Sequence, residues 1–174
     1  MASFAILFFF AVTGLTLNHT EWFAGQQKTV QTKGLINKAW LNNPVAKLEV
    51  VEFLRKTHGV KGALTDFRVE ESQCAVSFKG PGYTADTSID RQSAAYEITE
   101  TRMGLVAIIN DLHKGRDSGK GWSLMIDVSA VLMCLVSLSG ILLILFLQKR
   151  RVSGLLVAAA GAVLSYIVYV IWVP

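Results

Sequence analysis

The chain has 174 residues, of which 52% are hydrophobic, and a formal net charge of +4 at pH 7. The polar block at 24–122 carries 14 basic and 11 acidic residues, so it lacks the excess of cations that a nucleic-acid-binding face requires. The composition therefore argues against nucleic acid as a partner. The length and composition fit one small polar domain together with apolar segments that suit the lipid bilayer.

Three apolar stretches, 1–17, 123–147 and 152–173, are predicted to be transmembrane helices. A bilayer core of about 30 Å needs roughly 20 apolar residues, a length that the second and third stretches reach. The first covers only about 24 Å at 1.5 Å per residue. It has no charged start, so we expect a retained helix rather than a cleaved signal peptide. Whether the natural protein extends upstream of Met1 is left open.

A basic cluster predicts how the chain is oriented. Lys149, Arg150 and Arg151 lie between the last two apolar stretches, and short loops rich in Lys and Arg stay in the cytoplasm. We therefore expect 148–151 to be a cytoplasmic loop. The polar block would then lie in the periplasm of a bacterium, held to the inner membrane by a multi-pass anchor.

The polar block predicts an α+β domain over 43–114, after a connector at 18–42 and before a loop at 115–122. Asn43 and Pro44 are expected to open a helix that ends at Gly59, and Thr101 is expected to cap a second helix. Between these helices, apolar residues alternate with polar ones, which is typical of antiparallel strands with one buried face. The pattern predicts an antiparallel sheet of about four strands, around 67–69, 74–78, 83–89 and 94–98.

Two histidines are candidate ligands. His19 follows the first apolar stretch and His113 precedes the second, so the expected topology places both on one face of the membrane. Two neutral imidazoles at such positions could be axial ligands of a haem b or could share a metal ion. Lys114 and Arg116 could hold haem propionates or an acidic iron chelate. The competing interpretation is that the histidines are hydrogen-bonded interface residues and that the cations contact lipid phosphates.

Asp127 lies about one turn inside the second apolar stretch. A carboxylate at that depth is costly unless it is neutralised or paired, so it is a candidate functional residue. It could equally stay near the interface and pair with Lys120 or Arg116. Small residues at 154, 158, 161 and 165 form a stripe that suits close helix packing. No motif of a hydrolytic enzyme or phosphate-binding loop is present, and no catalytic residue is assigned.

Three segments resemble the PepSY-associated transmembrane family of bacterial inner-membrane proteins. The first is Phe10–His19, which contains Thr-Gly-Leu and ends in Asn-His. The second is Lys79–Asp90, which begins with Lys-Gly-Pro-Gly-Tyr-Thr-Ala-Asp, and the third is Leu112–Gly121, which begins with Leu-His-Lys-Gly-Arg. The last is the most specific. The resemblance implies three membrane helices with an inserted PepSY-like domain. It also implies a link to iron-siderophore or haem uptake, in which His19 and His113 are the candidate haem ligands.

These observations favour an accessory or electron-transfer component of iron-siderophore or haem handling, or part of a ferric-chelate reductase system. Its partners would be haem or an iron chelate and other inner-membrane subunits. The alternatives are a membrane-tethered module that binds a peptide or protein along a sheet edge, and a structural subunit of a larger membrane complex.

Overall fold

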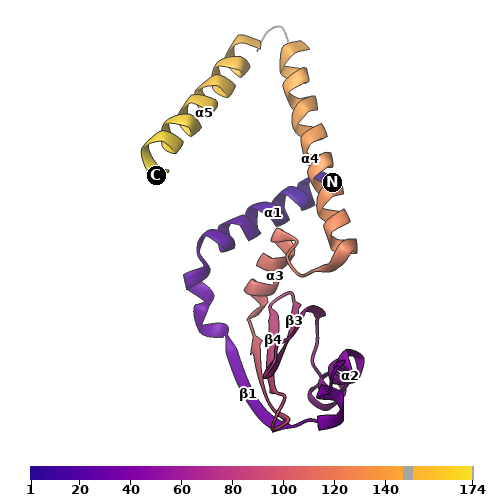
Figure 1. Ribbon diagram of the computed structural model, residues 1–174. Helices are drawn as coiled ribbons and strands as arrows, with labels where there is room; N and C mark the ends of the chain where they lie inside the picture. Colours follow the sequence, from indigo (N-terminus) through magenta and orange to yellow (C-terminus); the bar gives the residue numbers. More distant parts are fainter. Residues whose placement is uncertain (147–150, 174) are drawn as a thin grey trace. The chain divides into compact units, whose positions relative to one another are not determined.

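The computed structural model describes residues 1–146 and 151–173 (Figure 1). The chain divides into two compact units. One unit, Leu7–Asp127, holds the sheet and the helices packed on it. The other consists of Met1–Ile6 and Val128–Pro174.

Two helices are long and apolar enough to cross a membrane, namely α4 (Gly119–Phe146) and α5 (Arg151–Trp172). They match the second and third expected spans. Helix α1 (Ala2–Asn18) is apolar but shorter, so its crossing of the bilayer stays a prediction. The stripe of small residues on α5 includes Gly154, where an added Cβ would lie 2.7 Å from the side chain of Ile144 on α4. Of the basic cluster that predicts the orientation, Lys149 and Arg150 lie outside the described residues.

The sheet has five antiparallel strands, not the four expected from the sequence. Their spatial order is β1-β5-β4-β3-β2, with β1 (Lys28–Leu35) beside β5 (Ala95–Arg102), then β4 (Tyr83–Asp90), β3 (Gln73–Gly80) and β2 (Ala63–Val69). The additional strand is β1, which lies in the segment expected to be a connector. Its sequence shows no apolar alternation because it is an edge strand with exposed side chains at nearly every position. Burial periodicity could not reveal it.

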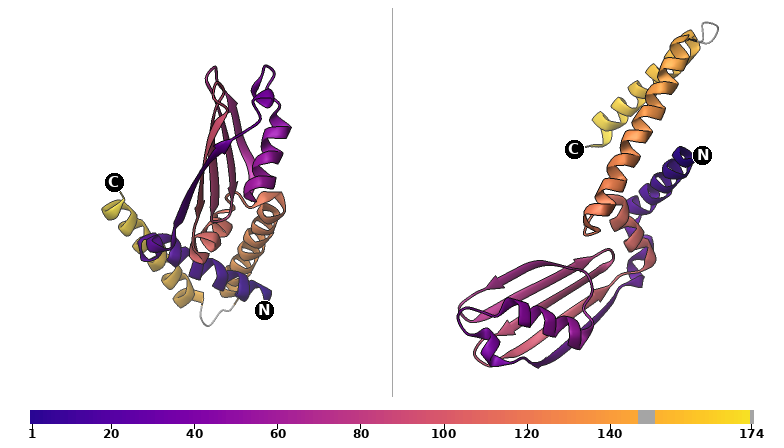
Figure 2. Two further views of the ribbon diagram at one scale, coloured as in Figure 1. Left: turned by 90° about the horizontal axis from the view of Figure 1, so that it is seen from below. Right: turned by 90° about the vertical axis from the view of Figure 1, so that its right-hand side faces the viewer.

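Helix α2 (Lys47–His58) covers one face of the sheet (Figure 2). Val50 and Leu54 on α2 are fully buried. They share a hydrophobic core with side chains that alternate along the strands, among them Cys74, Val76, Phe78, Ala85, Ile89 and Ile98. Tyr96 reaches across the edge strand, where a Cβ on Gly34 would meet its ring. Its hydroxyl lies 2.7 Å from Nε2 of His58 at the end of α2.

The helices of this unit begin later than the sequence suggested. α2 starts at Lys47, and the Asn43 side chain instead accepts a hydrogen bond from Arg91 at 2.6 Å. Helix α3 (Leu105–Lys114) follows Gly104, since Thr101 belongs to β5. Gly59 does end α2 in a left-handed conformation, with φ 63°, as expected for a glycine at that position.

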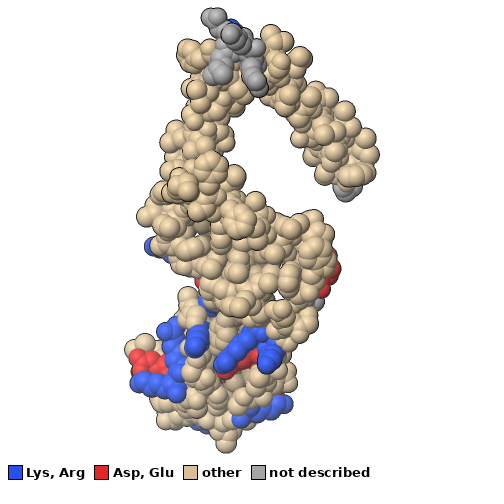
Figure 3. Space-filling model, turned by 180° about the vertical axis from the view of Figure 1, so that it is seen from behind, with Lys and Arg blue, Asp and Glu red and all other residues tan. Residues whose placement is uncertain are grey.

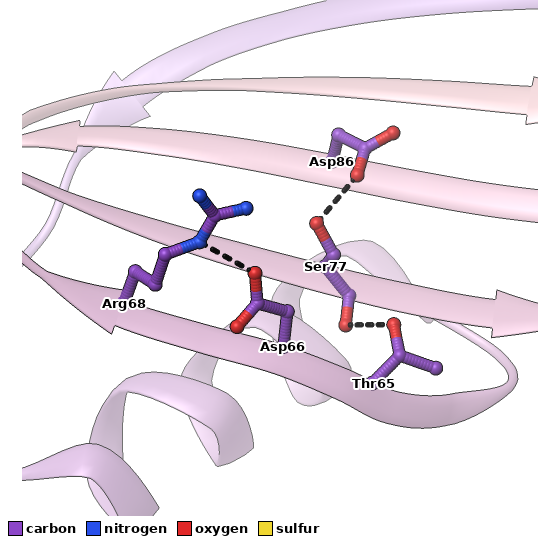
Figure 4. A network of polar contacts seen from close by, with 5 residues as sticks. All are labelled: Thr65, Asp66, Arg68, Ser77 and Asp86. Carbon is purple, nitrogen blue, oxygen red and sulfur yellow. Dashed lines mark hydrogen bonds and ion pairs between the residues drawn. The ribbon is translucent and has the colours of Figure 1, made fainter.

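The other face of the sheet is polar. Pairing of the strands places Gln31, Thr99, Asp86, Ser77 and Asp66 in one row across it. The Ser77 hydroxyl donates to Asp86 at 2.6 Å, and Arg68 donates to Asp66 at 2.7 Å (Figure 4). Lys and Arg side chains gather over this unit, with acidic side chains among them (Figure 3). Because its side chains are polar or charged, this face is suited to water.

Candidate functional site

His113 lies in the last turn of α3, where it contacts α1. Its Nδ1 atom is 2.5 Å from the Thr13 hydroxyl oxygen, and its ring packs edge-on against Phe10 with 5.0 Å between centroids. Thr13 is only 3% exposed. The α1–α3 contact therefore holds the imidazole in one orientation through a buried hydroxyl group.

The hydroxyl of Thr13 also determines which ring nitrogen of His113 carries the proton. A hydroxyl has a single proton to donate, and the Thr13 oxygen lies 2.7 Å from the carbonyl oxygen of Phe9, one turn back along α1. This is the usual backbone bond of a threonine inside a helix. With that proton used, Nδ1 of His113 must be the donor to Thr13. This assignment follows from the hydrogen-bond pattern, and it leaves the lone pair on Nε2.

The surroundings of His113 favour the neutral imidazole. Burial lowers the pKa of His113 below its ordinary value of 6.5, and the charge of neighbouring Lys114 lowers it further. Both effects disfavour a second positive charge on the ring. A neutral imidazole with a free Nε2 can accept a hydrogen bond or donate its lone pair to a metal ion.

His19 has a different environment. Its Nδ1 atom lies 3.2 Å from the Glu21 carboxylate, and its ring stacks on Trp22 with centroids 4.0 Å apart and the planes 5° from parallel. Thr13, the partner of His113, precedes His19 by six positions, which corresponds to about 9 Å of helical rise. Each histidine thus has its own partners, and a single iron shared by both stays a prediction.

The remaining predicted residues are spread over two helices and a loop. Lys114 is exposed at the end of α3. Arg116 has an exposed side chain, while its backbone N–H donates to the carbonyl of Asp111 and so closes the helix. Asp127 is exposed on α4 and has no hydrogen bond or ion pair to the residues that the structure describes. No ion pair joins Asp127 to Lys120 or Arg116 in this part of the chain, so the role of Asp127 stays a prediction.

Three polar contacts of α3 were missed by sequence reasoning. Asn110 is only 6% exposed, and its Oδ1 accepts a hydrogen bond from Thr16 at 2.7 Å. The Asp111 carboxylate accepts the backbone N–H of Gly82 at 2.8 Å, which docks the β3–β4 turn on α3. The Trp122 indole donates to the carbonyl of Leu112 at 2.7 Å. A polar Asn110 between Ile109 and Leu112, in an otherwise apolar helix pattern, was the available signal.

A cleft of about 380 Å³ lies between α3 and the short 3₁₀ helix η1 (Thr20–Gln26) that follows α1. The two elements are in contact, and η1 lies beside α3 in Figure 1. The cleft is lined by Thr20, Glu21, Phe23, Gln26, Gln27, Met103, Gly104, Val106, Ala107, Asn110, Asp111 and Lys114. It thus combines the buried Asn110, three charged side chains and an apolar wall.

The described residues contain no group of three or more His, Cys, Asp or Glu side chains placed to hold a metal ion. A metal ion enclosed entirely by protein ligands therefore has no candidate in this part of the chain. A haem iron needs only one or two axial protein ligands, and the Nε2 atom of His113 meets that smaller requirement.

Comparison with known proteins gives one match. The model of a family described as "Putative PepSY_TM-like" matches residues 1–174. No curated protein and no solved structure matches the chain.

Proposed function

This chain belongs to the PepSY_TM-like family, and from that premise we propose that it is a bacterial inner-membrane component of haem or iron-chelate handling. In this proposal His113 is the axial ligand of a haem iron, and the protein passes electrons as an accessory subunit or as part of a ferric-chelate reductase. The observation that carries the proposal is the Thr13–His113 hydrogen bond, because it leaves Nε2 of a neutral imidazole free.

The Thr13–His113 pair has the arrangement that metal-binding histidines use. Such histidines donate the other ring N–H to an oxygen atom, which fixes both the tautomer and the direction of the lone pair. Phe10 supplies an apolar neighbour at the ring edge. Lys114 and Arg116 are exposed just beyond His113 and would bind the propionates through charge-assisted hydrogen bonds. When bound, haem would supply one-electron chemistry.

The orientation proposed for the chain keeps the sheet-bearing domain in the periplasm. Two helices that can cross a bilayer and a basic cluster between them support this topology. Lys149 and Arg150 of that cluster lie outside the described residues, so the support comes from the sequence. Labelling single cysteines introduced at Lys38 and Arg151 tests it, since a reagent that does not cross the membrane should react with Lys38→Cys alone.

Haem binding by His113 is tested on the full-length protein, purified after expression with added haem. We expect a Soret band that is lost in His113→Ala and kept in His58→Ala, because His58 bonds to Tyr96 within the sheet domain. Thr13→Val should weaken haem binding about 10–100-fold, as removal of such supporting hydrogen bonds does. Thr13→Ser keeps the hydroxyl and should bind haem as the unchanged protein does.

The outcome for His19 decides how many imidazoles take part. If both histidines ligate one iron, His19→Ala should change the Soret band as strongly as His113→Ala does. If His113 acts alone, only the latter variant loses the band. A colourless protein after haem supplementation, or a band that survives His113→Ala, would overturn the proposal.

The edge strand β1 favours a second candidate, a membrane-tethered module that binds extended peptides. β1 is eight residues long and pairs with β5 on one side only, so its other side can accept a further strand. Lys28 and Lys33 on β1 would favour an acidic peptide, although edge lysines also discourage unwanted pairing. Gln31→Pro on β1 should abolish peptide capture by the full-length protein if this candidate is correct, and should leave haem binding unchanged. Gln31 lies between the positions whose N–H groups bond to β5, so its own N–H faces the open side of the strand.

A further inference from the structure

The cleft between η1 and α3 has one wall made by a single face of α3. Val106, Asn110 and Lys114 line it, and they are spaced four residues apart, which places their side chains on the same side of a helix. Asn110 and Lys114 are one turn apart, so their side chains are neighbours. The polar end of this wall is therefore formed by an amide and an ammonium group side by side.

Asn110 offers the cleft hydrogen-bonding capacity that the protein does not use. One half of its amide bonds to the Thr16 hydroxyl, whose single proton is also within reach of the Thr13 carbonyl oxygen, and the other half has no partner among the residues that the structure describes. Exchanging oxygen and nitrogen would only reverse this, because the Thr16 contact engages one half of the amide in either orientation. Asn110 is only 6% exposed, and it thus keeps one unpaired half of its amide in the cleft that it lines. That half is open to the cleft, where a ligand can bond to it.

The charged groups of the cleft have two signs. Lys114 is a cation with no ion pair in the described part of the chain, whereas Glu21 and Asp111 are carboxylates. Each carboxylate has one oxygen engaged, Glu21 with His19 and Asp111 with the N–H of Gly82. The second oxygen of each is open to a donor. A ligand with a single negative charge would face two carboxylates, and a purely cationic ligand would leave Lys114 unused.

The rest of the cleft is apolar and small. Phe23, Met103 and Val106 provide the apolar surface, and about 380 Å³ is near the lower end of the range for small-molecule sites. We propose that this cleft binds a zwitterionic apolar amino acid or dipeptide. The ligand carboxylate accepts from Lys114, its ammonium donates to Glu21 and Asp111, and its side chain packs on the apolar wall. The free half of the Asn110 amide bonds to whichever of the two charged groups its orientation suits. This goes beyond haem handling and does not use His113, although it shares Lys114 with the propionate contacts proposed above.

Binding of L-leucyl-L-leucine to the full-length protein in detergent, measured by isothermal titration calorimetry, tests the proposal. We expect saturable binding that weakens at least about tenfold with the N-acetylated peptide and with the C-terminal amide, since each loses a charge-assisted contact. L-Leucine in place of the dipeptide shows which size the cleft prefers. Absence of saturable binding, or equal affinity for the capped peptides, would overturn the proposal.

Lys114→Gln assigns the carboxylate contact within the cleft. Lys114 is exposed, so the variant should fold, and it should bind the free peptide and its C-terminal amide equally well. Lys38→Gln is the matched control, since Lys38 is exposed on the short 3₁₀ helix η2 (Lys38–Leu41) and does not line the cleft. It should keep the tenfold preference for the free carboxylate. A preference that persists in Lys114→Gln would show that the cleft does not bind the ligand in this way.

Discussion

Helices α2 and α3 belong to the same unit, yet they are held in different ways. α2 buries Val50 and Leu54 completely in the core above the sheet. α3 leaves Leu105 75% exposed and makes its specific contacts through Asn110 and His113. Apolar burial is strong but not directional, whereas buried hydrogen bonds fix one arrangement of the groups. The α2 side therefore stabilises the domain, and the α3 side fixes the arrangement of the polar side chains to which we assign binding.

The largest expected effect comes from removing apolar burial under α2. Leu54→Ala should lower the free energy of unfolding by about 2–5 kcal/mol, because it leaves a cavity at a fully buried position. Leu48→Ala is the matched control on the same helix, where the side chain is 67% exposed, and should change stability by less than about 0.5 kcal/mol. Urea unfolding followed by circular dichroism measures both. Similar losses in the two variants would contradict the role given to α2.

A smaller effect is expected where the sheet meets α3. Gly59 and Gly82 have nearly equal positive φ angles, 63° and 64°, so alanine at either position costs about 1–2 kcal/mol for the left-handed backbone. At Gly82 the new Cβ would also collide with Ile108 on α3, whereas at Gly59 no atom lies within 4 Å. Gly82→Ala should therefore lose about 1–3 kcal/mol more than Gly59→Ala in the same unfolding experiment. Equal losses would mean that the β3–β4 turn does not depend on α3.

The same contrast explains what could be predicted from the sequence. Strands β2 to β5 and the end of α2 at Gly59 were predictable because one buried face imposes period-two alternation and a left-handed helix end favours glycine. β1 was not predictable, since an exposed edge strand carries no burial pattern. The α2 start also differed, because Asn43 bonds to Arg91, a residue far along the chain.

The contacts of the candidate site were not predictable from the sequence, and the roles of His19 and His113 as ligands stay predictions. His113 is noticeable in the sequence because it stands beside cations before an apolar stretch. Nothing local indicates that Thr13 would be its partner or that Thr16 would reach Asn110, since these bonds join positions about a hundred residues apart. For the same reason, sequence reasoning grouped His19 with His113, although the structure gives each its own contacts.

The smallest effect is the pH dependence that His113 contributes to stability. Its pKa is lowered from 6.5 in the folded protein by burial and by Lys114, so the unfolded chain binds a proton more readily as the pH falls. The stabilisation is therefore present above pH 6.5 and is lost as the pH drops below it, toward the folded-state pKa. The melting temperature should fall more between pH 7 and pH 5 in the unchanged protein than in His113→Gln. The loss of melting temperature caused by Leu54→Ala should be the same at both pH values, because apolar burial involves no proton. Parallel curves of melting temperature against pH for the unchanged protein and His113→Gln would show that the α3 side is not held by a neutral imidazole.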